Sequence, residues 1–190
     1  CNEDIALMRT IPGMVILNPS DDIEAKAAVK AAYEHEGPVY MRFGRLAVPI
    51  INDRPDYKFE IGKGVTLREG KDVAIIATGL CVSESLAAAE KLAADGIDAK
   101  VINIHTIKPL DEDLVVAAAK ECGKVVTVEE HSVIGGLGSA VCETLSRKAP
   151  TPVKNIGVQD CFGESGPAVA LLEKYGLNAE GIYASVKEFV

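Results

Sequence analysis

One segment of the sequence gathers residue types that carry out chemistry. Residues 125–141, VVTVEEHSVIGGLGSAV, run from an apolar stretch through Glu129, Glu130 and His131 into a turn rich in glycine. Two carboxylates beside an imidazole can move a proton, and a glycine-rich turn before a helix can hold a phosphate against free backbone amides. The segment therefore allows a catalytic loop, an anion cradle, or the simple passage from one strand to one helix.

The spacing of glycines in the sequence argues against two specific kinds of site, a dinucleotide-binding site and a hydrolase serine. The dinucleotide fingerprint GxGxxG begins at Gly136 and Gly138 but has Val141 in its third position, and two carboxylates lie where a pyrophosphate needs positive potential. The stretch GESGP lacks the second glycine of the turn that presents a hydrolase serine. We interpret Gly135, Gly136 and Gly138 as a close helix approach whose amides could hold a carboxylate or an anion, and His131 as a capping or bridging residue.

Cysteine and histidine do not form a metal or disulfide pattern. The three histidines occur in no HExxH motif, and the five cysteines are odd in number, far apart and never paired as CxxC. We therefore predict no metal site and no disulfide framework, and we expect most of the cysteines to be small buried residues.

Charge and hydropathy limit the class of partner. The chain of 190 residues has a formal net charge of -8, which disfavours nucleic acid and anionic lipid as partners, and its apolar runs are too short to span a membrane. We expect a cytoplasmic globular protein. The opening stretch CNEDIALMRTIPGM has neither an initiator methionine nor a helix cap, so we expect a piece of a longer chain.

The first third of the sequence predicts a β-α-β unit. The apolar run at 14–19 ends in Asn-Pro, as a buried strand does; a helix with Ser20 as its N-cap follows, and Gly37 and Pro38 end it. The stretch PVYMRFGR then alternates as a second strand, most simply parallel to the first.

The rest of the chain predicts an α/β fold. Residues 46–64 carry prolines and charges without helical period, which indicates a surface linker. Beyond them, four apolar runs typical of strands (72–78, 98–105, 124–130 and 152–159) alternate with helical patterns (83–96, 111–123, 138–148), and two more helical stretches close the chain. We predict a mostly parallel open sheet with helices on both faces, and a division into residues 1–47, a linker at 48–65, and a domain at 66–190.

Five stretches together resemble a known family. They are EDIALMRTIPGMVILNPSD, GPVYMRFGR, DVAIIATG, IKPLDED and VEEHSVIGGLGSAV, and they are similar to the C-terminal portion of transketolase, especially the form split into two polypeptides. Deoxyxylulose-5-phosphate synthase and the β subunits of 2-oxo acid dehydrogenases carry a similar VEE segment, so both remain alternatives. The resemblance covers essentially the whole chain, and the IALMRTIPGM stretch favours transketolase.

The resemblance implies an activity and a set of partners. Transketolases of the pentose phosphate pathway transfer a two-carbon ketol unit between sugar phosphates, using thiamine diphosphate and a divalent metal, and form homodimers. Residues 1–47 resemble the tail of the pyrimidine-binding domain, and 66–190 the C-terminal domain. The residues that bind cofactor and metal lie upstream in that family, so we expect no catalytic, cofactor-binding or metal-binding residue here, an N-terminal segment or subunit as partner, and no activity from this chain alone.

The resemblance assigns a role to two arginines. It places Arg42 where the family has an arginine that binds the substrate phosphate, with Arg45 as a near neighbour. From the residues alone, an arginine at a strand end indicates a surface salt bridge. The resemblance leaves His131 and the turn Gly135–Gly138 structural. A second hypothesis is a non-catalytic assembly or regulatory domain whose pocket near residues 132–138 holds an anion.

Overall fold

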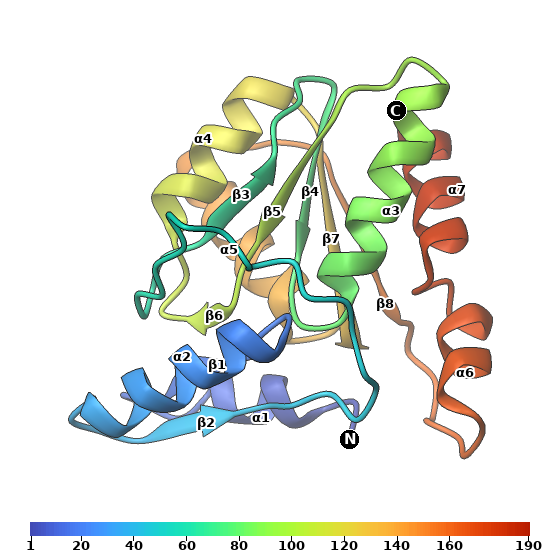
Figure 1. Ribbon diagram of the computed structural model, residues 1–190. Helices are drawn as coiled ribbons and strands as arrows, with labels where there is room; N and C mark the ends of the chain where they lie inside the picture. Colours follow the sequence, from blue (N-terminus) through green and yellow to red (C-terminus); the bar gives the residue numbers. More distant parts are fainter.

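Two sheets organise the chain, which the computed structural model describes over residues 1–190. A three-stranded sheet has the order β2-β1-β6, and a five-stranded sheet has the order β3-β5-β4-β7-β8 (Figure 1). The elements are α1 (Asp4–Arg9), β1 (Val15–Leu17), α2 (Asp22–Glu34), β2 (Val39–Met41), β3 (Val65–Arg68), β4 (Val73–Ala77), α3 (Cys81–Ala94), β5 (Ala99–Asn103), β6 (Thr106–Lys108), α4 (Glu112–Cys122), β7 (Val125–Ser132), α5 (Leu137–Lys148), β8 (Val153–Val158), α6 (Ala168–Lys174) and α7 (Ala179–Phe189).

The predicted β-α-β unit is present at the start of the chain. Strands β1 and β2 pair in parallel, as expected, with α2 between them in sequence. The N-cap of α2 is Asp21 and not Ser20, because the Asp21 carboxylate accepts the Glu24 N–H at 2.9 Å. Ser20 is buried instead, and its hydroxyl donates to the Glu24 carboxylate at 2.7 Å. The prediction of the cap was therefore wrong by one residue.

The C-terminal part of the chain completes the N-terminal sheet. Strand β6 pairs antiparallel with β1, on the side of β1 away from β2. Ile107 of β6 packs with Ile5 and Ile16 in one small apolar cluster, and all three are almost fully buried. The sequence analysis did not predict β6, and this strand joins the two parts of the molecule through main-chain hydrogen bonds.

The five-stranded sheet confirms the predicted mostly parallel fold. Strands β4, β5, β7 and β8 are the four predicted apolar runs, and neighbours among them pair in parallel. Strand β3 was not predicted; it pairs antiparallel with β5 at the sheet edge and begins at Val65, the last residue of the expected linker. No helix of the protein reaches the length and hydropathy that crossing a bilayer requires.

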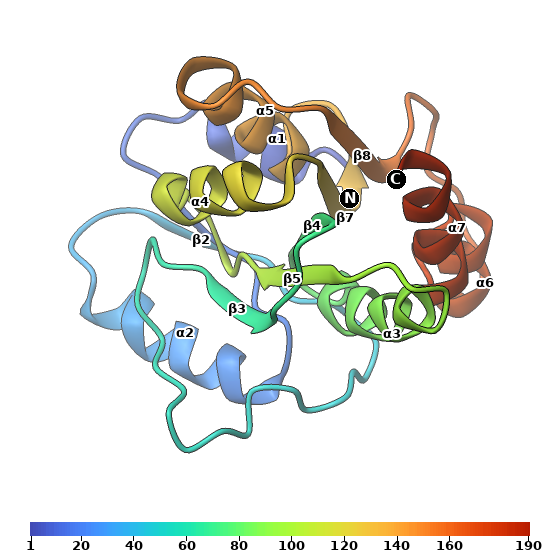
Figure 2. The ribbon, with the colours of Figure 1, turned by 90° about the horizontal axis from the view of Figure 1, so that it is seen from above.

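Helices cover both faces of this sheet, which explains the continuous apolar runs. In β4, Val73 and Ile75 face a cluster built with α3, α6 and α7, whereas Ala74 and Ile76 face a cluster built with α4 and α5. Figure 2 shows the sheet between these two layers. The central strands β4 and β5 are buried along their whole length, so only their ends are free to carry functional groups.

The segment that connects β2 to β3 is bound to the elements on both of its sides. Its residues 46–64 contain no helix or strand, but the N–H groups of Ile51 and Asn52 donate to Asp21 at 2.8 Å. The buried Glu24 carboxylate accepts from Tyr57 and from Asn103 of β5, each at 2.8 Å. One acidic side chain of α2 therefore connects the N-terminal unit, the connecting segment and the larger sheet.

Candidate functional site

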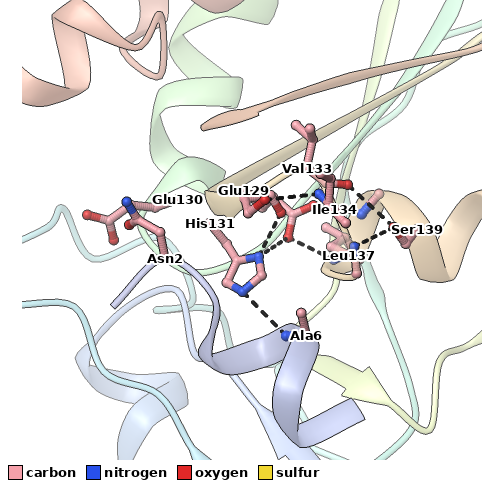
Figure 3. A network of polar contacts seen from close by, with 12 residues as sticks. Asn2, Ala6, Glu129, Glu130, His131, Val133, Ile134, Leu137 and Ser139 are labelled. Carbon is pink, nitrogen blue, oxygen red and sulfur yellow. Dashed lines mark hydrogen bonds and ion pairs between the residues drawn. The ribbon is translucent and has the colours of Figure 1, made fainter. Parts of the chain in front are cut away.

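The glycine-rich turn after β7 is filled by a side chain of the protein itself. Glu129 is completely buried, and its two carboxylate oxygens accept the N–H groups of Leu137 and Gly138 at 2.7 and 2.8 Å (Figure 3). A Cβ atom on Gly136 would collide with this carboxylate, and one on Gly138 would lie 2.9 Å from Thr127 Oγ1. The interpretation of these glycines as a close helix approach is confirmed, and the carboxylate at the helix amides is Glu129.

Two opposing effects act on Glu129. Burial disfavours the ionised carboxylate, whereas the N–H groups of Gly138 and Leu137 favour it. Burial is the larger effect and raises the pKa of Glu129 to about 7. The turn is therefore a place where a proton binds near neutral pH, but no substrate can reach it.

His131 bridges two elements and presents no free nitrogen. Its Nδ1 lies 2.7 Å from the Ser132 carbonyl oxygen, to which it donates, and its Nε2 accepts the Ala6 N–H of α1 at 3.4 Å. Burial lowers the pKa of this fully enclosed imidazole, which keeps it neutral in agreement with these roles. The expected bridging role is confirmed.

Arg42 is largely enclosed by partners from three parts of the chain. Its Nε lies 3.1 Å from the Asp4 carboxylate, its Nη2 donates to the carbonyl oxygens of Cys1 and Glu130 at 3.2 and 2.9 Å, and its Nη1 lies 3.6 Å from the Glu130 carboxylate. The side chain is 14% exposed. Sequence reasoning missed these partners, since they lie far from Arg42 in the sequence and only the tertiary fold brings them there.

Asp4 completes this arrangement. Burial alone would raise its pKa, but the hydrogen bond from Tyr40 at 2.7 Å and the charge of Arg42 outweigh burial, so the pKa of Asp4 is lowered. Asp4 therefore stays ionised at neutral pH and holds the guanidinium of Arg42 in place.

Arg45 differs from Arg42 in having no partner. Its side chain is exposed and forms no hydrogen bond or ion pair with the protein. Both arginines line a cavity of about 380 Å³, and Arg45 also lines an adjoining cavity of about 520 Å³ with Glu130, Ser165 and Tyr175. The fold thus brings the two predicted arginines together, whereas His131 and the glycine turn line neither cavity.

The side chains of the protein show no arrangement suited to a metal. No three histidine, cysteine, aspartate or glutamate side chains lie close enough together to hold a metal ion. The residues present therefore do not fit a divalent cation, and the cavity near Arg45 instead suits an anion.

Comparison with known proteins assigns the family. The family model of the transketolase C-terminal domain matches residues 62–182, and that of the transketolase pyrimidine-binding domain matches residues 2–50. The chain belongs to the transketolase family. The recognition made from the sequence motifs is therefore confirmed, together with the fold that it implied.

Relatives in this family act on different substrates. The chain is 48% identical over 186 residues to the 6-deoxy-6-sulfo-D-fructose transketolase subunit SqwH of Clostridium sp. (strain MSTE9), covering 98% of this chain and 58% of that protein. It is 43% identical to a subunit of the apulose-4-phosphate transketolase of Phocaeicola vulgatus, covering 98% and 60%. It is 40% identical to 1-deoxy-D-xylulose-5-phosphate synthase 1 of Geobacter sulfurreducens, covering 98% and 30%.

A solved structure agrees closely in fold. It is described as a split gene transketolase, inactive beta4 tetramer, and it is 52% identical with a TM-score of 0.94. The comparison covers 99% of this chain and 61% of that one. This transketolase-family chain therefore spans about 60% of the length of the split subunits that it matches.

Proposed function

We propose that this chain is the C-terminal part of a transketolase that moves a two-carbon ketol unit between sugar phosphates of the pentose phosphate pathway. Transketolase subunits among the relatives and the match to two transketolase domains support this reaction. The structural observation that supports the proposed reaction is Arg45, an unpaired cation in a cavity large enough for the end of a sugar phosphate.

The two arginines take different parts in the proposed phosphate site. A guanidinium offers paired donors that match two phosphate oxygens, and Arg45 has all of its donors free. In Arg42 only Nη1 remains available, with Glu130 at 3.6 Å. Arg45 therefore makes the main contact with the phosphate, and Arg42 adds one donor from a fixed position.

The cofactor belongs to the partner. Complete enzymes of this family depend on thiamine diphosphate, and we propose that the N-terminal segment or subunit holds it with its divalent metal. This chain contributes the phosphate site and is inactive alone. The description of the solved relative as inactive supports this part of the proposal.

We further propose self-association and a cytoplasmic location. The solved relative is described as a tetramer of one kind of chain, and a homodimer is the unit from which a closed tetramer is most simply built. All five cysteines are free thiols, as is usual in a reducing compartment.

Two other functions are weaker. Some support for a deoxyxylulose-5-phosphate synthase comes from the relative that is 40% identical, and such an enzyme would use pyruvate as donor. An assembly or regulatory domain with an anion pocket at residues 132–138 is disfavoured, because Glu129 already occupies the two helix amides that an anion would need.

An assay of the complete enzyme decides among these functions. The chain is combined with its N-terminal partner, thiamine diphosphate and Mg²⁺, and offered xylulose 5-phosphate or pyruvate as donor with a phosphorylated aldose. Ketol transfer from xylulose 5-phosphate supports the proposal. Turnover of pyruvate alone favours the synthase, and turnover of neither donor favours the assembly domain.

A further inference from the structure

The carboxyl ends of strands from both sheets meet at the two adjoining cavities that Arg45 lines. Arg42 and Arg45 follow the end of β2, Leu80 follows β4, Glu130 lies near the end of β7, and Val158 ends β8. Figure 1 shows the N-terminal elements below the larger sheet, at the end toward which β7 points. In open parallel sheets ligands bind beyond the carboxyl ends of strands, and here strands of two sheets end at the same pair of cavities.

The charges around the cavity show what such a ligand must be. Five charged side chains line the two adjoining cavities, and four of them have partners: Asp4 and Glu130 face Arg42, and Glu164 is bound by Lys174 and by Tyr175 at 2.9 Å. Arg45 is the fifth and has no partner among the side chains of the protein. The side-chain charge that is free to meet a ligand here is therefore positive, and it suits one anionic group.

The C-terminal unit supplies part of the lining of the cavity that Arg45 also lines. Ser165 and Gly166 belong to the loop of residues 159–167 between β8 and α6, and they line the same 520 Å³ cavity as Arg45. Ser165 is exposed, and its hydroxyl forms no hydrogen bond within the protein. A free hydroxyl and a free guanidinium thus face one space from two different units of the chain.

We propose that the loop 159–167 forms part of the substrate site and that Ser165 is a specificity-determining residue for the phosphate-bearing end of the sugar. This inference rests on the proposed function, since it extends the phosphate site of Arg45. The hydroxyl of Ser165 binds a phosphate oxygen. The loop limits how far a longer substrate, or one with a second anionic group, can extend. The C-terminal unit therefore takes part in choosing the substrate.

A charge introduced at Ser165 tests the proposal in the complete enzyme. Ser165→Asp places a carboxylate in the cavity that Arg45 lines. We expect KM for a phosphorylated donor to rise about tenfold or more, because the carboxylate competes with the phosphate for one guanidinium. Ser165→Ala removes one hydrogen bond from a neutral hydroxyl to the charged phosphate and should raise the same KM about tenfold. In both variants the ratio of KM for the phosphorylated donor to KM for the unphosphorylated donor hydroxypyruvate should therefore rise.

Control variants separate this inference from the proposed function. Ser146→Asp adds the same charge at an exposed position of α5 outside both cavities, and should change neither KM. Arg45→Ala tests the phosphate site itself. If Arg45→Ala raises KM for the phosphorylated donor while Ser165→Asp does not, or if Ser165→Asp impairs both donors equally, the inference about the loop is overturned. If Arg45→Ala has no effect on KM, the phosphate site of the proposed function fails.

Discussion

Replacing Glu129 by glutamine separates the two effects that act on this buried carboxyl group. Burial raises the pKa of Glu129 from 4.5 to about 7, against the opposing effect of two helix amides. Glutamine has nearly the same shape and keeps one oxygen acceptor, but it does not titrate. The comparison of the two proteins across pH therefore reports the ionisation of this one side chain.

The sign and size of the effect follow from the shift. A carboxyl group with a raised pKa binds its proton more tightly in the folded protein, so its contribution to stability is complete below about pH 4.5. That contribution is lost as the pH rises through about 7. A shift from 4.5 to about 7 corresponds to about 3 kcal/mol. The wild type should therefore lose about 3 kcal/mol of unfolding free energy relative to Glu129→Gln between pH 4.5 and pH 8.

Denaturant unfolding at several pH values measures this difference directly. The free energy of unfolding of each protein is obtained at constant ionic strength, and the value for Glu129→Gln is subtracted from that of the wild type. Glu90→Gln, at an exposed position of α3, is the matched control and should give a flat difference. A difference that grows with rising pH would refute the reasoning, because the helix amides would then outweigh burial.

Three further perturbations have defined outcomes. Arg42→Ala leaves Asp4 and Glu130 without their cation, so it should lower the unfolding free energy by about 1–3 kcal/mol and also raise KM for phosphorylated sugars. Arg45→Ala should raise that KM about 10- to 100-fold without loss of stability. Thermal melts and kinetics distinguish the two variants. The isolated chain should release no heat on titration with thiamine diphosphate, and measurable binding would contradict the assignment of the cofactor to the partner. Sedimentation at micromolar concentration should give a dimer or a larger closed assembly, and a monomer alone would contradict the proposed association.

The sequence predicted the elements that local pattern determines. Strand β4 is a run of five fully buried residues between two helical layers, so its apolar composition identifies it without any knowledge of its neighbours. The parallel pairing of β1 and β2 followed from the helix between them. The role of the glycines near 136 followed from their place in a tight turn between a strand and a helix.

Features that depend on distant contacts were not predictable in the same way. Strand β6 has only three residues, Thr106–Lys108, and it is a strand because β1 lies beside it. On α2 the apolar Val29 is 52% exposed, whereas the charged Glu24 is fully buried, so residue type alone does not give the packing face of this helix. Tyr57 and Asn103 make that burial possible by donating to the Glu24 carboxylate.

Ile5 shows the same dependence on distant contacts. It lies near the start of the chain, and it is fully buried because it packs with Ile16 and with Ile107, about a hundred residues away in the sequence. Leu7, on the same helix, is 63% exposed. Of these two residues, only Leu7 is therefore free for the proposed self-association.

The pairing of β6 with β1 limits how evolution can exchange parts of this protein. A recombination point within residues 46–64 would interrupt no helix or strand, because that segment contains none. Recombination at this point would nevertheless take β1 from one parent and β6 from the other. The incoming β6 would have to keep both the antiparallel register with β1 and the contact of Ile107 with Ile5 and Ile16. Chimeras joined there should therefore fold only when both parents share this strand.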